Sequence, residues 1–190
     1  ASHGRFSRDT AAALKSLATS SVGVKNTFVS IQITQTIAQI ELLEQQLSEL
    51  ETVISDAMSK LDPVIMSVPG IGVIDGAMIV SEIGDIKRFS SSGKLLAYAG
   101  LDPVVCQSGK FTARSTRMSK RGSKTLRFAL INAAWQLTLH DKTFADYYTL
   151  KRSQGLNHYA ALGHVAHKLV RVIFKLLRDN IPFQPQNFSA

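Results

Sequence analysis

The chain has 190 residues, of which 45% are hydrophobic, and a formal net charge of +8. Its length allows one domain, or a small domain with an extended arm, and we favour the second arrangement. A single cysteine, Cys106, excludes an intrachain disulfide and leaves a cysteine-based zinc site without ligands. Because no run of about 18 apolar residues and no secretory signal occurs, we predict a cytoplasmic, nucleoid-associated protein without a membrane partner.

Residues 1–32 are predicted to form an N-terminal arm with one helix, from about residue 10 to residue 20. Ser, Thr and Ala are frequent there, the apolar periodicity is weak, and Gly23 interrupts any longer helix. The chain begins at Ala1 without an initiator methionine, which suggests a processed or truncated polypeptide.

The pattern of residues 33–62 predicts a long coiled-coil helix that Asp62 and Pro63 end. Spacings of three and four alternate without a break through Ile40, Leu43, Leu47, Leu50, Ile54, Ala57 and Leu61. Such a seam favours pairing with another helix. The partner is either a second copy, which makes a homo-oligomer through residues 33–61, or an antiparallel helix of an upstream part of the same polypeptide. Packing against its own domain is the remaining alternative.

Residues 63–182 are predicted to form a compact, mainly α-helical domain with one small β-hairpin, followed by a tail at residues 183–190. Its first motif, Val68-Pro69-Gly70-Ile71-Gly72, lies between two apolar helical stretches and resembles a helix-hairpin-helix element. Gly70 and Gly72 allow positive φ and let backbone N–H groups approach a phosphate oxygen. A tight turn that needs glycine only for close packing is the alternative.

Three further helices and the hairpin complete the predicted domain. A short helix over residues 93–103 is capped by Gly100 and stopped by Pro103, and the hairpin follows over residues 104–113. Ser123 is a suitable N-cap for the next helix, whose apolar face holds Leu126, Leu130, Ala133, Ala134 and Leu137. The last helix is predicted over roughly residues 158–178.

Residues 104–135 carry seven cations and no acidic residue, which makes this stretch the expected functional region. The cations are Lys110, Arg114, Arg117, Lys120, Arg121, Lys124 and Arg127. Lys and Arg neutralise phosphates and release their condensed counterions, so the concentrated charge predicts DNA or RNA as the partner. A solvated charged face is the alternative. Arg127 is the member best placed to pair within the fold instead.

The histidines do not predict a metal site. His158, His164 and His167 share one predicted helix, but no cysteine or carboxylate completes a ligand set, and a helical histidine often bonds a neighbour. The His140-Asp141 pair fits a helix end better than an acid–base pair. The remaining aromatic side chains of this region, interpreted as core and rim residues, are Trp135, Phe144, Tyr147 and Tyr148.

Four motifs in this order resemble the C-terminal transposase domain of the IS-one-ten/IS-one-sixteen insertion-sequence family, which includes the Piv-type DNA invertases. The motifs are Val68-Pro69-Gly70-Ile71-Gly72, Leu96-Ala97-Tyr98-Ala99-Gly100-Leu101-Asp102-Pro103, Gln107-Ser108-Gly109-Lys110 and Ser119-Lys120-Arg121-Gly122-Ser123-Lys124-Thr125-Leu126-Arg127. The likeness covers about residues 64–180, and residues 33–61 would correspond to the coiled-coil linker of the family. It implies a DNA recombinase that moves a mobile element, guided in members of the family by a bridge RNA.

The resemblance also implies a serine nucleophile, and the matching residue is Ser108. Members of the family carry an N-terminal RuvC-like domain with acidic metal ligands, which has no counterpart in these 190 residues. We therefore expect Mg²⁺ only in the full-length enzyme, no cofactor in this chain, and no activity of this chain alone. Judged by residues alone, Ser-Gly is an ordinary turn pair, and Ser115, Ser119 and Ser123 remain alternatives.

Two other functions remain open at this point. The first is a non-catalytic nucleic-acid-binding module that uses the glycine turn and the cations. The second is a coiled-coil assembly domain whose basic face has a supporting role.

Overall fold

α-Helices account for nearly all regular structure in the computed structural model, which confirms the mainly α class. The structure describes residues 7–23, 26–104, 107–108, 111–112 and 118–185. The chain divides into two units, residues 1–48 and 49–190. Among the described residues, no helix combines the length and the apolar content that a bilayer crossing requires.

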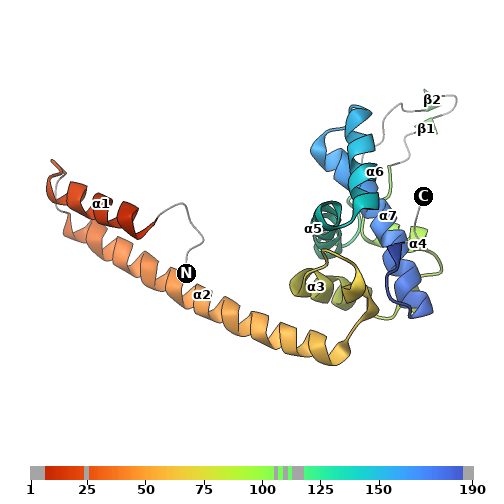
Figure 1. Cartoon of the computed structure of the whole chain (residues 1–190), viewed down its shortest axis with the longest axis horizontal. Helices are drawn as coiled ribbons and strands as arrows, with labels where there is room; N and C mark the ends of the chain where they lie inside the picture. Colours follow the sequence, from red (N-terminus) through yellow and green to blue (C-terminus); the bar gives the residue numbers. More distant parts are fainter. Residues whose placement is uncertain (1–6, 24–25, 105–106, 109–110, 113–117, 186–190) are drawn as a thin grey trace. The chain divides into compact units, whose positions relative to one another are not determined.

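The first unit contains helix α1 and most of helix α2 (Figure 1). Helix α1, Arg8–Thr19, begins after Ser7, whose hydroxyl oxygen accepts a hydrogen bond from the backbone N–H of Thr10 at 3.2 Å. This confirms the helix predicted for the arm. Helix α2, Thr27–Leu61, begins after Asn26, whose side-chain oxygen accepts hydrogen bonds from two backbone N–H groups of the first turn. The cap explains why α2 begins earlier than residue 33.

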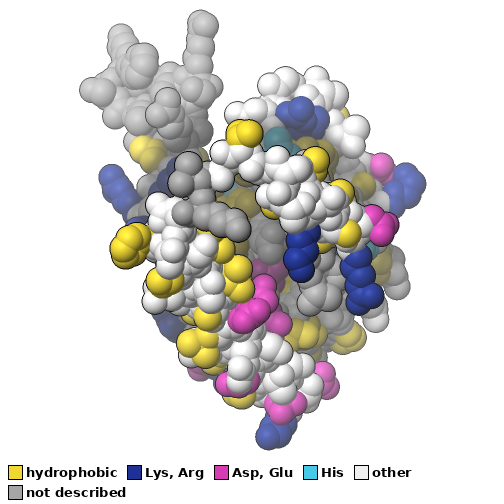
Figure 2. Space-filling model, turned by 90° about the vertical axis from the view of Figure 1, so that its left-hand side faces the viewer, with side chains coloured by type: hydrophobic (Ala, Val, Ile, Leu, Met, Phe, Trp, Pro, Cys, Tyr) yellow, Lys and Arg dark blue, Asp and Glu magenta, His cyan; other side chains and the backbone are white. Residues whose placement is uncertain are grey.

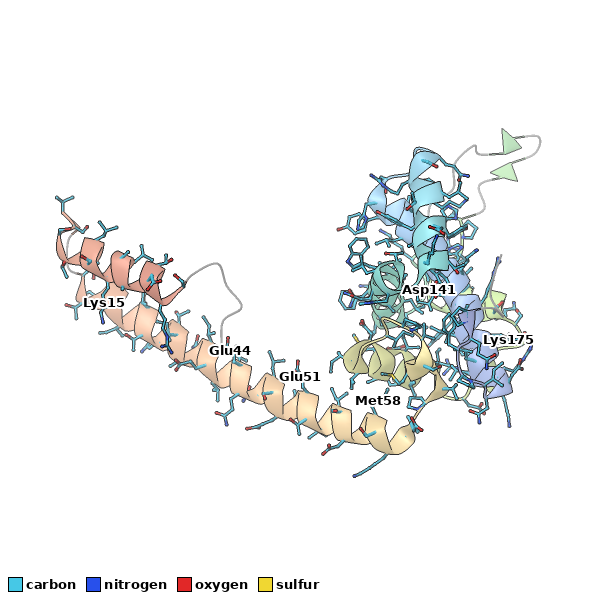
Figure 3. The ribbon with its side chains drawn as sticks, in the orientation of Figure 1. Lys15, Glu44, Glu51, Met58, Asp141 and Lys175 are labelled. Carbon is cyan, nitrogen blue, oxygen red and sulfur yellow. The ribbon has the colours of Figure 1, made fainter. Side chains whose placement is uncertain are left out.

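The heptad seam of α2 is open to solvent over most of its length. Ile40, Leu43 and Leu47 each keep half or more of their surface exposed. Figure 2 shows one face of the molecule, on which hydrophobic side chains lie at the surface among polar ones. Only near its C-terminal end does α2 bury a side chain, Met58, which is labelled in Figure 3. Helix α2 therefore carries the apolar face that a coiled coil requires, but the coiled coil and the partner helix remain predictions.

The second unit is a helical domain whose centre is formed by α5, Lys124–His140, and α7, His158–Asp179 (Figure 1). Helix α5 packs against α3, Val73–Ile83, against α6, Lys142–Ser153, and against α7. Helix α7 also contacts α4, Ser92–Tyr98, and a 3-10 turn, Val64–Ser67. Leucines such as Leu126 and Leu169 are completely buried in this core. Each such side chain stabilises the fold by about 1.5–3 kcal/mol.

Side-chain caps set the ends of the two central helices. The hydroxyl oxygen of Ser123 accepts a hydrogen bond from the backbone N–H of Leu126 at 3.1 Å, which confirms Ser123 as the N-cap of α5. Asn157 caps α7 in the same way through the N–H of Ala160. At the other end, Asn180 adopts φ +50°, a left-handed conformation that terminates α7. The predicted last helix is confirmed to within one residue at its C-terminal end.

Helix α6 is the element that the sequence interpretation missed. Asp141, labelled in Figure 3, ends α5 and caps α6 at once, because its carboxylate accepts a hydrogen bond from the backbone N–H of Phe144 at 3.1 Å. The interpretation of His140-Asp141 as a helix end is thus confirmed, but a second helix starts there. Phe144 is buried and Tyr147 and Tyr148 are half-buried, so α6 supplies the aromatic residues expected at the core and its rim.

The structure differs from the prediction at the helix-hairpin-helix element, and it supports the predicted β-hairpin only in part. The stretch before the glycine turn is a single 3-10 turn, so only one α-helix, α3, directly flanks the predicted helix-hairpin-helix element. Strands β1, Gln107–Ser108, and β2, Phe111–Thr112, pair antiparallel, with Ser108 opposite Phe111. These pairs of residues are too short to establish the hairpin predicted over residues 104–113, much of which lies outside the described residues.

Candidate nucleic-acid interface

Two segments far apart in sequence run side by side at the base of the basic stretch. Residues 98–103 and 118–123 are joined by backbone hydrogen bonds from Ser119 to Asp102 (2.8 Å), from Lys120 to Gly100 (3.0 Å) and from Ser123 to Tyr98 (2.7 Å). Pro103 and Met118 form a further antiparallel bridge. We call these paired segments the clasp. The clasp pairs Pro103 with Met118, and the chain between these two residues contains Ser108.

Glycine is required at two positions of the clasp. Gly100 has φ +65°, and a Cβ atom there would come within 2.7 Å of the backbone nitrogen of Gly122. A Cβ atom on Gly122 would overlap the carbonyl oxygen of Tyr98. Any side chain at these positions therefore forces the two segments apart. Gly100 was expected only as a helix cap, and the role of Gly122 was missed.

Two side-chain hydrogen bonds lock the clasp. The hydroxyl of Ser119 donates to the carboxylate of Asp102 at 2.5 Å, and both residues are half-buried. The guanidinium of Arg127 donates to the carbonyl oxygen of Ala99 at 3.1 Å. This confirms that Arg127 pairs within the fold. Ser119 has a structural bond, and Ser123 is committed to capping α5, so neither hydroxyl is free of a structural role.

The clasp and the first turn of α5 display three exposed cations. They are Lys120, Arg121 and Lys124, and all three residues are exposed to solvent. None of the ion pairs in the described part of the chain includes them. Lys124 is also the first residue of α5, where the helix dipole adds positive potential. A phosphate group near these side chains would meet charge that no carboxylate already neutralises.

The rest of the predicted basic site lies outside the described residues. This applies to Lys110, Arg114 and Arg117, and to the alternative serine, Ser115. Of Ser108 the structure describes only the backbone pairing with Phe111. The nucleophile and these three cations therefore remain predictions.

The glycine turn at residues 68–72 packs directly on α5. Gly70 has φ +86°, and a Cβ atom there would come within 2.9 Å of the backbone nitrogen of Leu137 and closer still to Gln136. Gly70 is thus required by close packing, which was the alternative explanation for this motif. Gly72 differs, because it precedes α3 with φ −73° and nothing lies near its Cβ position.

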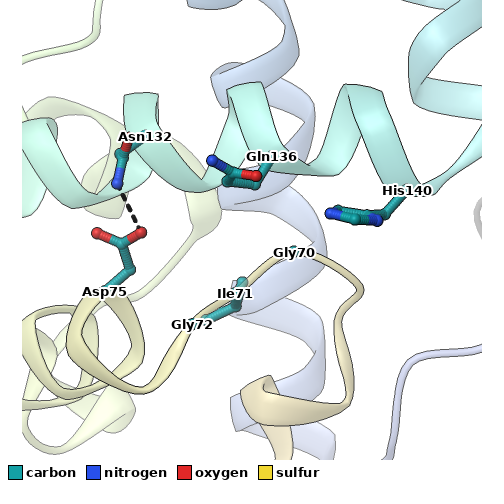
Figure 4. A pocket seen from close by; sticks show the side chains of 7 residues that line it. All are labelled: Gly70, Ile71, Gly72, Asp75, Asn132, Gln136 and His140. Atoms are coloured by element: carbon teal, nitrogen blue, oxygen red, sulfur yellow. Dashed lines mark hydrogen bonds between the residues drawn. The ribbon is translucent and has the colours of Figure 1, made fainter. Parts of the chain in front are cut away.

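A cavity of about 350 Å³ opens beside this turn, and Figure 4 shows its lining. The lining residues are Gly70, Ile71, Gly72, Asp75, Asn132, Gln136 and His140. Asp75, in the first turn of α3, accepts a hydrogen bond from the side-chain amide of Asn132 at 2.8 Å. Partial burial raises the pKa of Asp75, and the Asn132 bond opposes this. Above that pKa its negative charge opposes a phosphate at the start of α3, so phosphate binding by Gly70 and Gly72 remains a prediction with an unfavourable neighbour.

No group of three or more His, Cys, Asp or Glu side chains within the described ranges is arranged to hold a metal ion. The helical histidines have other partners. His158 shares a hydrogen bond of 2.8 Å with the hydroxyl of Tyr148, and the Nε2–H of His167 donates to the carbonyl oxygen of Leu101 at 2.7 Å. Burial lowers the pKa values of His164 and His167, and neighbouring cations lower them further.

Comparison with known proteins identifies the domain. Residues 62–149 match a family model described as Transposase IS116/IS110/IS902 family. The chain is 35% identical over 122 residues to the "Insertion element IS116 uncharacterized 44.8 kDa protein" of Streptomyces clavuligerus, a match that covers 64% of this chain and 30% of that protein. It is also 35% identical over 82 residues to the "Transposase for insertion sequence element IS1111A" of Coxiella burnetii, covering 43% of this chain and 22% of that protein.

A third relative is the "Pilin gene-inverting protein" of Moraxella bovis, which is 28% identical over 120 residues, or 63% of this chain and 37% of that protein. The chain therefore spans well under half the length of each of these relatives. The matched residues include the glycine turn, the clasp and all of α5. Residues 62–149 are therefore similar to the Transposase IS116/IS110/IS902 family.

Proposed function

We propose that this chain is a DNA strand-exchange part of a transposase, which binds DNA through the clasp and supplies Ser108 as the nucleophile. The similarity to transposases supports the transposase function. The observation that carries the finer proposal is the clasp. It pairs Pro103 with Met118, on either side of the segment containing Ser108, and it displays the exposed cations Lys120 and Arg121.

In the proposed reaction, the hydroxyl oxygen of Ser108 attacks a phosphorus atom of the DNA backbone. The bond between this phosphorus and one bridging oxygen breaks, the hydroxyl proton passes to a base, and the departing DNA end takes up a proton. The product is a phosphoserine linkage that keeps the energy of the broken ester. A DNA hydroxyl then attacks this linkage, which rejoins the strand and restores the serine.

The cations have a distinct part in this reaction. Lys and Arg side chains stabilise the extra negative charge that develops on the phosphate during attack. Lys120 and Arg121 are exposed and adjacent to the segment, while Lys110, Arg114 and Arg117 belong to the segment itself. Mg²⁺ held by acidic residues of another domain would polarise the phosphate when bound. Arg127 is less available, since its guanidinium bonds Ala99.

The proposal extends to partners. The open seam of α2, with Leu43 and Leu47 more than half exposed, supports association of chains through residues 33–61. A bridge RNA is proposed as the guide. Because the proposed substrate is DNA, the protein is proposed to act at the nucleoid in the cytoplasm. Both proposals draw on the family rather than on a described contact.

Covalent trapping tests the proposed nucleophile. In a complete transposase that contains this chain, a radiolabelled DNA substrate with a nick beside the cleavage site should become attached to the protein through serine. Ser108→Ala should abolish the adduct and reduce recombination by at least about 10³-fold, because no other group replaces an absent nucleophile. The affinity for DNA should stay within about twofold, since the cations remain.

Ser115→Ala is the matched control, because it removes a serine hydroxyl from the same segment. It should leave the adduct in place. An adduct that persists in Ser108→Ala and disappears in Ser115→Ala would contradict the assignment of Ser108.

A further inference from the structure

The outer side of α7 carries basic residues that the sequence interpretation left without a role. His164, Lys168 and Arg171 follow one another at spacings of four and three, so they share one face of the helix. At the helical rise, these neighbours lie about 6 Å and about 4.5 Å apart along the axis. Arg171 is exposed, and Lys168 is half-buried.

Helix α6 adds a further cation to the same face. The ammonium nitrogen of Lys168 lies 4.1 Å from the centroid of the Tyr147 ring, and that of Lys151 lies 5.4 Å from the same centroid. Two like charges therefore share one half-buried ring. Lys151 also donates a hydrogen bond to the side-chain oxygen of Gln154 at 3.1 Å, which is a neutral partner.

No ion pair in the described part of the chain includes Lys151, Lys168 or Arg171. Lys142 pairs with Asp146 at 2.9 Å and Arg178 pairs with Asp179 at 2.9 Å, whereas Arg152 donates to the carbonyl oxygen of Leu156 at 2.8 Å. Lys151, Lys168 and Arg171 therefore repel one another across the face. A bound polyanion would relieve this repulsion.

The face lies next to the clasp. His167, one position before Lys168, donates its Nε2–H to the carbonyl oxygen of Leu101, which belongs to the clasp. The positive charge of the face affects the pKa values of two nearby histidines. Beyond the effect of burial, the charge of Lys151 lowers the pKa of His164, and the charge of Arg171 lowers that of His167. Asp102 is the acidic neighbour of His167, and its carboxylate already accepts the hydrogen bond of Ser119.

We propose that Lys151, Lys168 and Arg171, the α6–α7 basic face, bind the phosphate backbone of duplex DNA as a second contact beside the clasp. The inference rests on the proposed function and extends the DNA-binding surface to helices outside the predicted basic stretch. Phosphates of one strand follow one another about every 3.4 Å along the duplex axis, so Lys168 and Arg171, about 4.5 Å apart along α7, can reach neighbouring phosphates.

Duplex DNA fits this face better than a single strand. Proteins that bind single strands combine cations with aromatic rings on which bases stack. The ring on this face, Tyr147, is half-buried and has Lys168 over it, so it is not available for stacking. What the face offers is charge at fixed positions on two packed helices, which suits a regular backbone.

The salt dependence of DNA binding by the 190-residue chain tests the proposal. The triple variant Lys151→Gln/Lys168→Gln/Arg171→Gln would be compared with the unchanged chain on a 30-base-pair duplex, from low to moderate salt. We expect the slope of log Kd against log salt to fall by about 2 to 3, because each lost phosphate contact removes about 0.9.

A matched control is available on the same two helices. Lys142→Gln/Lys175→Gln/Arg178→Gln removes two lysines and one arginine as well, but these side chains pair with Asp146 or Asp179. This variant should leave the slope almost unchanged. Equal slopes for the two triple variants would overturn the proposal, because the effect would then follow net charge alone. So would a slope unchanged in the first triple variant.

The polymer and the fold need their own controls. If the first triple variant weakens binding of a single strand or of an RNA duplex but leaves binding of the DNA duplex unchanged, the assignment to duplex DNA is wrong. If that variant does not fold, as judged by circular dichroism, Arg171→Gln at the exposed position replaces it, with an expected slope change of about 0.9. An unchanged slope for Arg171→Gln overturns the proposal.

The clasp variant Lys120→Gln/Arg121→Gln separates this inference from the proposed function. A slope that falls in the clasp variant but not in the α6–α7 variant would reject the second contact and leave the clasp as the DNA site. A slope that falls only in the α6–α7 variant would support the second contact and reject DNA binding by the clasp.

Discussion

Helices α2 and α7 have similar apolar patterns and different surroundings. Both carry hydrophobic side chains at alternating spacings of three and four. In α7, Val165 and Leu169 are completely buried, whereas in α2 Ile40 keeps 50% of its surface exposed and Leu47 keeps 58%. Periodicity therefore predicts an apolar face on a helix without identifying what covers that face.

The connections around the two helices explain the difference. Helix α7 follows α6 after a turn of a few residues, and α6 follows α5 at Asp141, so these three helices must pack as neighbours. Helix α2 is joined by a short connection to α1, but none of the side chains of α1 is buried. The partner that covers the seam of α2 remains a prediction.

The largest expected effect comes from removing a buried leucine of α7. Leu169→Ala leaves a cavity in the core and should lower the free energy of unfolding by about 2–5 kcal/mol, measured by urea denaturation of the chain. Leu47→Ala is the matched control on α2. It should change the unfolding of the helical domain by no more than about 0.5 kcal/mol, as expected for an exposed site.

Equal losses of unfolding free energy in Leu169→Ala and Leu47→Ala would contradict the difference between α7 and α2. They would show that the seam of α2 contributes to the same cooperative unit as the core of the domain. The open seam would then not be a free face.

The next prediction concerns the partner of α2. If the seam joins two or more copies, Leu47→Asp places a charge in the interface and should reduce the mass in sedimentation to that of one chain, 20.7 kDa. Glu44→Gln, on the flank of the same helix, is the control and should leave the mass as it is. A single-chain mass for the unchanged protein would instead favour an intramolecular partner helix.

The smallest expected effect is a pH dependence that belongs to α7. Burial holds the pKa of His167 below its usual value, and the bond to Leu101 only partly opposes this. The unfolded chain therefore binds a proton more readily, so the free energy of unfolding should fall as the pH drops below about 6.5. His164 acts in the same direction.

Thermal unfolding between pH 7.5 and pH 5.5 measures this effect, in a range above the usual pKa of carboxylates. His167→Gln keeps a donor for the Leu101 carbonyl and removes the titration, so its melting temperature should vary less with pH. A steeper dependence in this variant would contradict the role of His167.

The helical fold was largely predictable because local signals determine it. Ser123 and the apolar spacing behind it correctly predict α5, and the last helix is found from its own periodicity. Helix α6 was missed because Asp141 is both the C-cap of α5 and the N-cap of α6, and only the first role was recognised. Its carboxylate bond to the N–H of Phe144 spans three residues, as the Ser123 cap does, so the start of α6 was also a local signal.

The candidate site was predictable only in part. The cluster of cations is a property of composition, and Lys120, Arg121 and Lys124 do lie exposed together near the clasp. The α6–α7 basic face was not recognised, because Lys151 and Lys168 lie 17 positions apart and meet only through Tyr147. The requirement for Gly122 likewise depends on Tyr98, which is distant in sequence.

The sequence by itself determined the helical class, the apolar faces, the family motifs and the concentration of positive charge, because these depend on residue type and short spacing. The tertiary structure decided which apolar face is covered, which glycines are required and which cations lack a carboxylate partner. These features depend on contacts between residues far apart in the chain. Such contacts exist only after α5, α6 and α7 have packed together.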